Sequence, residues 1–354
     1  MKLLFVASPV GTLKSGQVGG VGINILNISR EMLRRGHQLK VLAPVGSAIE
    51  SLPIKEVAGE FQPSAPNQTR SEPIIIPQNA VLANMWNQVC EIQNQYDIVF
   101  NFAYDWLPFY LAPFFKRPPL HLINLVSWTL VMDRAIEQVA SLCPGTLGVH
   151  TKAQAETYQI PSECFRVLGG AIDITKYEFC PEPGDSLAWA GRISPEKGLE
   201  DAVAVAEALG VKLKIFGYLQ NREYWQQICD RYPHAPLEYM GFLPTHNFQA
   251  ELRKCRALLM THKWVEALGR VALEALACGV PIISYGRGGP LEIVVHGQTG
   301  WLVEPDNLDE LIAAIKNIDQ IDRHQCRQQA ETEYSLPALG DRLEQWFKDV
   351  LSSR

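Results

Sequence analysis

The pattern that most constrains the fold is an alternation of short apolar runs with stretches of helical periodicity, and it starts twice along the chain. In the first half, KLLFVAS (2–8) predicts a strand, VGINILNISREMLRRGH (21–37) a helix, and QLKVLAP (38–44) the next strand. Gly36 marks the end of that helix. Repeated β–α units of this kind predict a parallel, doubly wound sheet with helices on both faces.

Further strands are predicted in both halves. In the first half they are IIIP (74–77), YDIVFNF (96–102), LHLINL (120–125) and TLGVH (146–150). In the second half they are SLAWAGR (186–192), VKLKIFG (211–217), LEYMGFL (237–243), RALLMTH (256–262) and PIISYG (281–286). PIKEVAGEFQPSAPNQTRSEP (53–73) interrupts the pattern, and we expect a long loop there that is either functional or disordered.

Two domains are expected because 354 residues exceed what one hydrophobic core usually serves. The expected architecture is α/β, with two Rossmann-like doubly wound domains facing a cleft and the ligand at the carboxyl ends of the strands. The Gly- and Pro-rich stretch 167–185 is the expected linker between an N-terminal domain (1–166) and a C-terminal domain (186–334). The tail (335–354) has an amphipathic pattern and is expected to form a helix that packs back on the N-terminal domain.

Charge and composition exclude several classes of function. Residues 1–165 hold 12 Lys and Arg against 12 Asp and Glu, so the net charge of −6 lies in the rest of the chain. Without a clustered basic surface we expect no nucleic-acid partner, and a neutral first half argues against association with anionic lipid. No apolar run of the sequence approaches the roughly 20 residues that span a bilayer. The eight cysteines form no C-x-x-C pair, which is typical of reduced thiols in a cytoplasmic protein, and the oligomeric state is left open.

Three motifs carry candidate binding residues. The first, GQVGGVG (16–22), stands between the first strand and the first helix, where Gly19 and Gly20 would let a phosphate approach the helix amides. The glycine spacing is irregular and no acid ends the second predicted strand. Phosphate contact and a plain tight turn are therefore equal alternatives at this motif.

The second motif, WAGRISPEKGLEDA (189–202), begins at a strand end with Gly191 and Arg192, and a helix opens after Lys197. Two fixed cations there would neutralise a diphosphate, with Arg192 offering a planar fork and Lys197 a point charge. The alternative is a pair of solvated surface cations. A position at the carboxyl end of a strand favours the binding role.

The third motif, WVEALGRVALEALACG (264–279), places Glu266 and Glu274 on either side of Leu268 and Gly269. Gly269 would let a phosphate or sugar reach the free amides of the first helical turn, and Glu274 lies roughly 7–8 Å further along the helix. A carboxylate can accept two hydroxyl groups at once, so the pair suits the two diols of a nucleotide sugar. The alternative is a solvated helix face.

In this order the motifs resemble glycosyltransferase family 4, together with Asp97-Ile98-Val99, the Gly170–Asp173 stretch and GQTGWLV (297–303). The resemblance runs nearly end to end and implies a GT-B fold, a retaining mechanism and a nucleotide-diphosphate sugar as donor, with no metal or other cofactor. It implies that Arg192 and Lys197 hold the diphosphate, Glu274 the ribose, and Glu266 with the Leu268–Gly269 amides the transferred hexose. The remaining implied donor contacts are Gly19, Gly20 near the distal phosphate, Gly191, and the backbone around Phe242 and Leu243, which would receive the base.

One position departs from the family, whose members usually carry a His after the strand that matches LHLINL (120–125). Here Asn124 stands at that place with Ser127 soon after, and we expect one of these two side chains to be the polar substitute near the reacting sugar carbon. Of these two we include Asn124 among the candidate catalytic residues, together with Arg192, Lys197 and Glu266. His121 is interpreted as a core residue of the strand.

The acceptor is expected to bind the N-terminal domain. Asp105 is a candidate acceptor residue, although a surface turn acid is an equal alternative, and Trp106, Ser127 and Trp128 complete the candidate set. The missing His and the start MKLLFVASPVGTLKSGQVGGVG resemble the UDP-glucose:tetrahydrobiopterin α-glucosyltransferases, which implies glucose transfer to a pteridine. The alternatives are a sugar-lipid or oligosaccharide transferase with the same donor site, a nucleotide-sugar 2-epimerase, and a non-catalytic binder.

Overall fold

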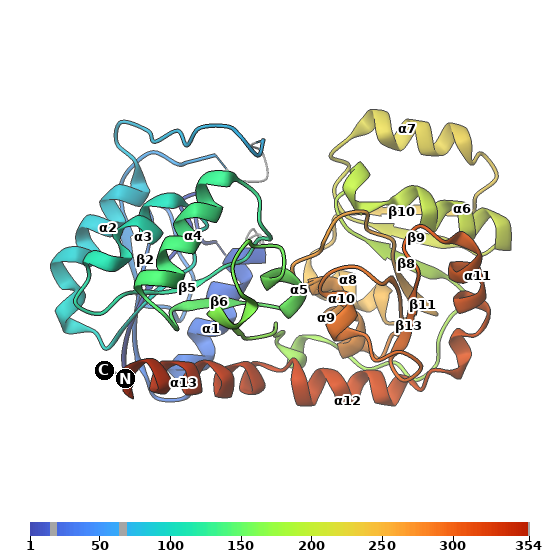
Figure 1. The fold of residues 1–354 in the computed structure, drawn as a ribbon. Helices are drawn as coiled ribbons and strands as arrows, with labels where there is room; N and C mark the ends of the chain where they lie inside the picture. The colour runs from blue at the N-terminus through green and yellow to red at the C-terminus, as the bar shows by residue number, and fades with distance from the viewer. Residues whose placement is uncertain (15–19, 64–68, 353–354) are drawn as a thin grey trace. The chain divides into compact units, whose positions relative to one another are not determined.

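The computed structural model describes residues 1–14, 20–63 and 69–352, and the chain divides into two compact domains. The first domain comprises Met1–Gly169 and Leu336–Arg354, and the second comprises Gly170–Ser335. Each domain is a parallel sheet with helices on both faces, so the predicted pair of Rossmann-like domains is confirmed (Figure 1). Residues 170–185, which lie in the expected linker, group with the second domain.

The sheet of the first domain has seven strands in the order β3-β2-β1-β4-β5-β6-β7. Its central strands are runs of buried apolar residues because helices cover both faces of the sheet. The strand order reverses between β1 and β4, and ligands usually bind at the carboxyl ends of strands at such a point. The strands are β1 (Lys2–Val6), β2 (Gln38–Pro44), β3 (Ile54–Val57), β4 (Ile98–Asn101), β5 (Leu120–Leu122), β6 (Leu147–Val149) and β7 (Phe165–Val167).

The structure corrects two predictions in this domain. The run IIIP (74–77) is not a strand, and Ile75 and Ile76 are 65% and 51% exposed. The strand β3 lies instead inside the segment 53–73 that we expected to be a loop, and it pairs with β2 at the edge of the sheet. An edge strand carries charged residues without penalty, as β3 does at Lys55 and Glu56, so its sequence lacks the apolar run of a central strand.

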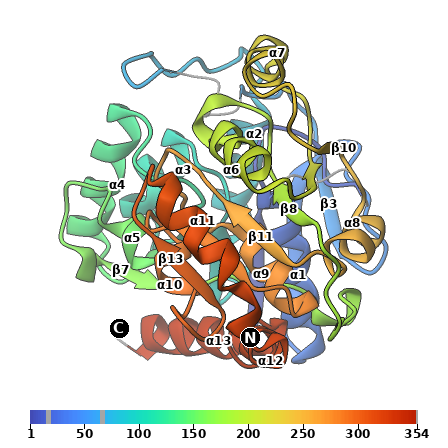
Figure 2. The ribbon, with the colours of Figure 1, turned by 90° about the vertical axis from the view of Figure 1, so that its right-hand side faces the viewer.

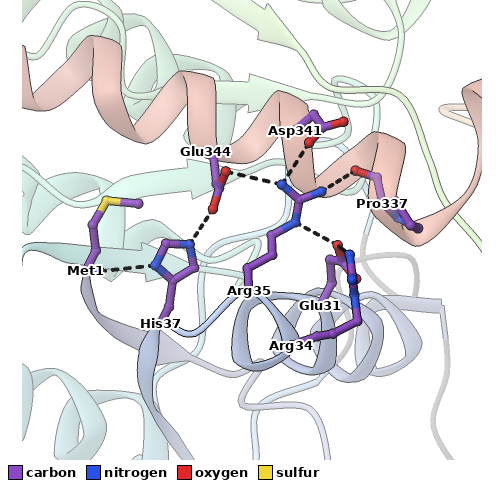
Figure 3. Close-up of polar contacts among 8 residues, drawn as sticks. All are labelled: Met1, Glu31, Arg34, Arg35, His37, Pro337, Asp341 and Glu344. Carbon is purple, nitrogen blue, oxygen red and sulfur yellow. Dashed lines mark hydrogen bonds and ion pairs between the residues drawn. The ribbon is translucent and has the colours of Figure 1, made fainter.

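The C-terminal helix α13 (Leu336–Ser352) is part of the first domain and packs against α1 (Gly20–Arg34). Figure 3 shows the polar cluster that fastens it: Arg35 Nη1 donates to Asp341 at 2.8 Å and to Glu344 at 3.2 Å. His37 Nε2 lies 2.7 Å from Glu344 Oε1. The other helices of this domain are α2 (Val81–Ile92), η2 (Gln93–Gln95), α3 (Trp106–Leu111), η3 (Ala112–Phe114), α4 (Leu130–Leu142), α5 (Lys152–Ala155) and η4 (Ser162–Cys164).

The sheet of the second domain has six parallel strands in the order β10-β9-β8-β11-β12-β13, and this order reverses between β8 and β11. The sequence did not predict β13, in which Gly300 lies so close to β12 that a Cβ there would meet the Ile282 carbonyl at 1.9 Å. The strands are β8 (Leu187–Ala190), β9 (Leu213–Phe216), β10 (Leu237–Gly241), β11 (Ala257–Met260), β12 (Ile282–Tyr285) and β13 (Gly300–Val303).

Helices cover both faces of the second sheet. Helix α6 packs with α11 on one side of the strands, whereas α9 packs with α8 and α12 on the other (Figure 2). In the described part of the chain, no helix has both the length and the hydropathy needed to cross a lipid bilayer. The helices are η5 (Ile174–Lys176), η6 (Pro195–Lys197), α6 (Leu199–Leu209), α7 (Arg222–Arg231), α8 (Thr245–Leu252), α9 (Arg270–Cys278), α10 (Pro290–Ile293), α11 (Leu308–Lys316), η7 (Ile318–Gln320) and α12 (Arg323–Glu333).

Candidate functional site

The candidate site is built from the loops that follow β8 and β11, the two strands between which the strand order of the second sheet reverses. These loops are locked together at Gly198, whose φ is +63° and where a Cβ would lie 1.9 Å from the Thr261 carbonyl oxygen. The Thr261 hydroxyl also donates to the Gly198 carbonyl at 2.6 Å. This close contact requires a glycine and fixes the loop that carries Lys197 against the loop that carries Glu266.

Lys197 and Glu266 form an ion pair at the centre of the site, with Nζ 2.7 Å from Oε2. The indole N–H of Trp264 donates to the same oxygen at 2.7 Å, and the Lys197 ammonium lies 4.7 Å from the centre of the Trp264 ring. Burial would raise the pKa of Glu266, but Lys197 and the indole donor more than offset it, so this pKa lies below its ordinary value. The site therefore presents an ionised carboxylate beside a held ammonium group, each with 18% of its side chain exposed.

The amino terminus of α9 borders this ion pair. Gly269 caps the helix with a φ of +81°, and the amides of Leu268 and Gly269 make no hydrogen bond within the described residues. Gly289 approaches from the loop after β12 and donates its amide to the Glu266 carbonyl at 2.7 Å. Free amides at a helix start attract an anion or an electron-rich oxygen, so this end of α9 suits a phosphate or a sugar.

Glu274 lies one turn further along α9, with 16% of its side chain exposed. The Tyr177 hydroxyl donates to its Oε1 at 2.9 Å, and Arg270 Nε lies 3.8 Å from the same oxygen. Burial raises the pKa of Glu274, and Arg270 and the Tyr177 hydroxyl offset only part of that effect. The two predicted acids thus sit in opposite electrostatic surroundings, and Tyr177 is a neighbour that the sequence did not reveal.

The structure does not bring Arg192 to the Lys197–Glu266 pair. Its guanidinium instead lies 3.1 Å from Glu196 and donates to Gln220 at 3.2 Å, with 39% of the side chain exposed. Gly191, at the end of β8, donates its amide to the Phe216 carbonyl at 2.9 Å. Arg192 therefore stands at the rim of the site, on the loop that also carries Lys197.

The predicted base position holds a pair of stacked aromatic rings. Phe242 and Tyr218 follow β10 and β9, and their ring centroids lie 4.4 Å apart at an interplanar angle of 9°. They are 51% and 59% exposed, whereas Leu243 is half-buried against the core. Tyr218 escaped the sequence analysis, although its place directly after the predicted strand VKLKIFG (211–217) is a signal that could have found it.

In the first domain, Asn124 makes internal hydrogen bonds. Its Oδ1 accepts from Asn24 at 3.0 Å and lies 3.1 Å from His150 Nε2, and its Nδ2 donates to the Leu122 carbonyl at 3.0 Å. His150, which ends the predicted strand TLGVH, thus places an imidazole beside the altered position. His121 is fully buried and burial lowers its pKa to about 3, as expected of a core residue.

Asp105 caps α3 directly after β4, which borders the reversal of the first sheet. Its carboxylate accepts from the Leu107 amide at 3.4 Å and from Gln62 at 2.8 Å, and burial raises its pKa to about 6. Trp106 stacks on Tyr110 with ring centroids 4.5 Å apart. A carboxyl group with a raised pKa next to an aromatic pair favours the acceptor role of Asp105 over the alternative of a surface turn acid.

The remaining predicted residues are less informative. The Ser127 hydroxyl donates to Asp133 at 2.8 Å and accepts from Arg70 at 3.2 Å, which indicates a structural role. Trp128 donates its amide to the Tyr104 hydroxyl at 3.3 Å. Gly20 is the first residue of α1, and a Cβ added there would meet no atom of the described residues within 4 Å, whereas Gly19 lies outside those residues. Among the described residues, no three His, Cys, Asp or Glu side chains gather in a way that could hold a metal ion.

Comparison with known families concerns mainly the second domain. Residues 180–333 match the family model described as Glycosyl transferases group 1, which supports assignment of the second domain to that family. The glycogen synthase of Mycobacterium tuberculosis is 30% identical over 164 residues, 43% of this chain and 39% of that protein. The 2-deoxystreptamine N-acetyl-D-glucosaminyltransferase of Streptomyces fradiae is 29% identical over 195 residues, 51% of this chain and 41% of that protein. The chain thus spans about two fifths of the length of these curated relatives.

Solved structures share the fold over the whole chain. The complex of Anabaena HepE with UDP superposes with a TM-score of 0.76 at 18% identity and covers all of both chains. AviGT4, a glycosyltransferase involved in avilamycin A biosynthesis, superposes with a TM-score of 0.72 at 18% identity and covers 100% of this chain and 98% of its own. The predicted GT-B fold is therefore confirmed.

Proposed function

We propose that this chain is a retaining glycosyltransferase that moves a hexose, glucose from UDP-glucose in the first instance, to a hydroxyl group of a small acceptor. The observation that carries the proposal is the Lys197–Glu266 pair beside the free amides of Leu268 and Gly269. Both charged residues lie in the part of the chain that matches the group 1 glycosyltransferases. A structural neighbour of the same fold, Anabaena HepE, was solved with UDP-glucose, which supports this class of donor.

The second domain binds the donor in this proposal. Lys197 moves from Glu266 to the diphosphate, and Glu266 with the α9 amides then holds the hexose hydroxyls. Glu274 accepts the ribose hydroxyls, and the base rests against Tyr218 and Phe242. Arg192 joins the diphosphate after it leaves Glu196, for which its partial exposure leaves room.

The chemistry follows from where charge develops. The bond between the hexose C1 and the diphosphate oxygen breaks, and a bond forms between C1 and the acceptor oxygen on the same face of the sugar. The departing diphosphate oxygen takes the acceptor proton, so the products are an α-glycoside and UDP. Lys197, Arg192 and the start of α9 stabilise the negative charge that grows on the diphosphate, and no separate protein base is needed.

The acceptor binds the first domain, and a reduced pteridine such as tetrahydrobiopterin is the acceptor that we propose. A planar ring would stack on the Trp106–Tyr110 pair, in which Tyr110 is exposed and Trp106 is half-buried. The Asp105 carboxylate next to it would pair with the ring's N–H groups, as carboxylates do with planar donors. This part of the proposal is independent of the donor site and can fail separately.

The test is incubation of the protein with UDP-glucose and parallel panels of pteridine, sugar and lipid acceptors, with UDP release as the readout. Acceptor-dependent release of UDP and a product with an α-anomeric proton coupling are the expected results. If UDP is released with a sugar or lipid acceptor but not with any pteridine, the acceptor belongs to the sugar or lipid class. Inversion at C2 of the hexose would identify an epimerase, and tight binding of UDP-glucose without turnover would identify a binding protein.

A further inference from the structure

A tyrosine from the segment before β8 reaches the proposed ribose carboxylate. Tyr177 is 5% exposed, and its hydroxyl donates to Glu274 Oε1 at 2.9 Å. Arg270 faces the same oxygen at 3.8 Å. Among the described residues neither contact uses Oε2, and the carboxylate keeps a share of its surface open to solvent. The tyrosine therefore engages Oε1 and leaves Oε2 without a contact of its own in the described part of the chain.

The backbone that carries Tyr177 is held independently of this hydroxyl. Arg327 Nη1 donates to the Tyr177 carbonyl at 2.8 Å, and the next amide, of Glu178, donates to the buried side chain of Gln249 at 3.1 Å. The Cys180 amide donates to the Cys278 carbonyl at the end of α9 at 3.2 Å. Because these bonds fix the segment against α8, α9 and α12, the phenol ring positions Glu274 rather than the reverse.

We propose that the Tyr177 hydroxyl is a positioning group that orients the Glu274 carboxylate toward the 2′-hydroxyl of a nucleoside diphosphate and so discriminates ribose from 2′-deoxyribose. This inference rests on the proposed function, because it takes Glu274 to be the ribose acceptor. A hydroxyl that donates to a carboxylate restricts the rotation of that carboxylate. A hydrogen-bond acceptor that is already oriented binds its ligand at a lower entropic cost. The phenol also stabilises the ionised carboxylate against the burial that raises the pKa of Glu274.

The substitution Tyr177→Phe tests this role because the phenyl ring still fills its buried site and only the hydroxyl is lost. Tyr285→Phe is the matched control, since the fully buried Tyr285 donates to the Asp201 carboxylate at 2.8 Å elsewhere in the same domain. Binding of UDP and of 2′-deoxy-UDP is measured by calorimetry for the wild type, both tyrosine variants and Glu274→Gln. If the wild type prefers another base, the corresponding ribo and deoxy pair is used.

Tyr177→Phe is expected to weaken UDP binding by about tenfold, the value of one hydrogen bond to a charged group, and 2′-deoxy-UDP binding by much less. Its preference for the ribonucleotide should shrink, while Tyr285→Phe stays within about twofold of the wild type for both ligands. In the Glu274→Gln background, adding Tyr177→Phe should have little further effect.

Two failures are distinguishable. If Glu274→Gln keeps the wild-type preference for UDP over 2′-deoxy-UDP, Glu274 is not the ribose acceptor and that part of the proposed function is wrong. If Glu274→Gln abolishes the preference but Tyr177→Phe leaves both affinities and the preference unchanged, the positioning role of Tyr177 is wrong while the donor site stands.

Discussion

The Lys197 ammonium and the Glu266 carboxylate lie 2.7 Å apart and join the loops that follow β8 and β11. The two charges neutralise each other, and the Trp264 indole N–H donates to the carboxylate from a second side. A diphosphate that draws Lys197 away would free Glu266 for sugar hydroxyls. In the proposed mechanism the two charges therefore exchange partners when the donor binds, Lys197 for the diphosphate and Glu266 for the sugar hydroxyls.

The first prediction concerns Glu266→Gln. Because Glu266 is assigned to the hexose and not to the nucleotide, this change should lower turnover with UDP-glucose by about 10- to 100-fold, as expected for the loss of hydrogen bonds to a charged group. UDP affinity should not weaken, because Lys197 no longer has to leave a carboxylate to reach the diphosphate, and calorimetry with UDP and UDP-glucose separates the two effects. Glu251→Gln, which breaks the 2.6 Å pair with Lys214 elsewhere in the domain, is the control. Equal weakening of UDP and UDP-glucose binding would contradict the hexose assignment.

The second prediction concerns the base. Tyr218→Ala should weaken UDP binding by about tenfold, because stacking of a base on an aromatic ring is worth about 1–3 kcal/mol. Tyr218→Phe keeps the ring and should bind UDP like the wild type. The ring pair with Phe242 is exposed on the surface, so neither variant should unfold the domain. If Tyr218→Ala binds UDP with wild-type affinity, the base lies elsewhere.

The third prediction concerns Asp105, whose pKa burial raises from 3.8 to about 6. A raised carboxyl pKa means that the folded state binds the proton more tightly, so folding stability falls as pH rises from about 4 to about 6. The two-unit shift corresponds to at most about 3 kcal/mol at neutral pH. Asp105→Asn removes this cost and still caps α3. The amide of Gln62 can turn to offer its Oε1, which has no hydrogen-bond partner among the described residues.

Thermal unfolding should therefore show Asp105→Asn melting above the wild type at about pH 7.5 and together with it at about pH 4. The same variant should lose acceptor-dependent turnover, because the amide cannot accept two N–H groups of the pteridine. If the variant and the wild type melt at the same temperature at both pH values, Asp105 is solvated and its pKa is not raised. If Asp105→Asn turns over the pteridine at the wild-type rate, Asp105 is not part of the acceptor site.

Much of the fold could be predicted from the sequence because each β–α unit repeats a local pattern. KLLFVAS and SLAWAGR are buried apolar runs followed by glycine-containing loops. They form β1 and β8, the first strand of each sheet in chain order. The edge strand β3 could not be predicted, because Lys55 and Glu56 face solvent and leave no apolar periodicity. The run IIIP (74–77) was wrongly predicted as a strand for the opposite reason, since Ile75 and Ile76 are apolar but exposed.

The site was predictable where the residues lie on loops after predicted strands, as Lys197 and Glu266 do. Two residues that contact the candidate site residues, Tyr177 and His150, could not be predicted from the sequence. Tyr177 reaches Glu274 from 97 positions away, and only the packing of its segment on α9 brings the two together. His150 lies beside Asn124 because β5 and β6 are adjacent in the sheet, and strand adjacency is not written in the local sequence. Arg192 lies on the same loop as Lys197, as its sequence position indicates, but the direction of its guanidinium depends on Glu196 and Gln220.

The most direct test of the donor site is turnover of Lys197→Ala at saturating UDP-glucose and acceptor. Lys214→Ala, which removes an equally buried lysine from an ion pair with Glu251, is the control for loss of a charge pair. If Lys197 stabilises the leaving diphosphate, its removal should lower turnover by at least about 100-fold, the usual cost of losing one group that stabilises developing charge, while Lys214→Ala stays close to the wild type. Turnover of Lys197→Ala at the wild-type rate would contradict the account.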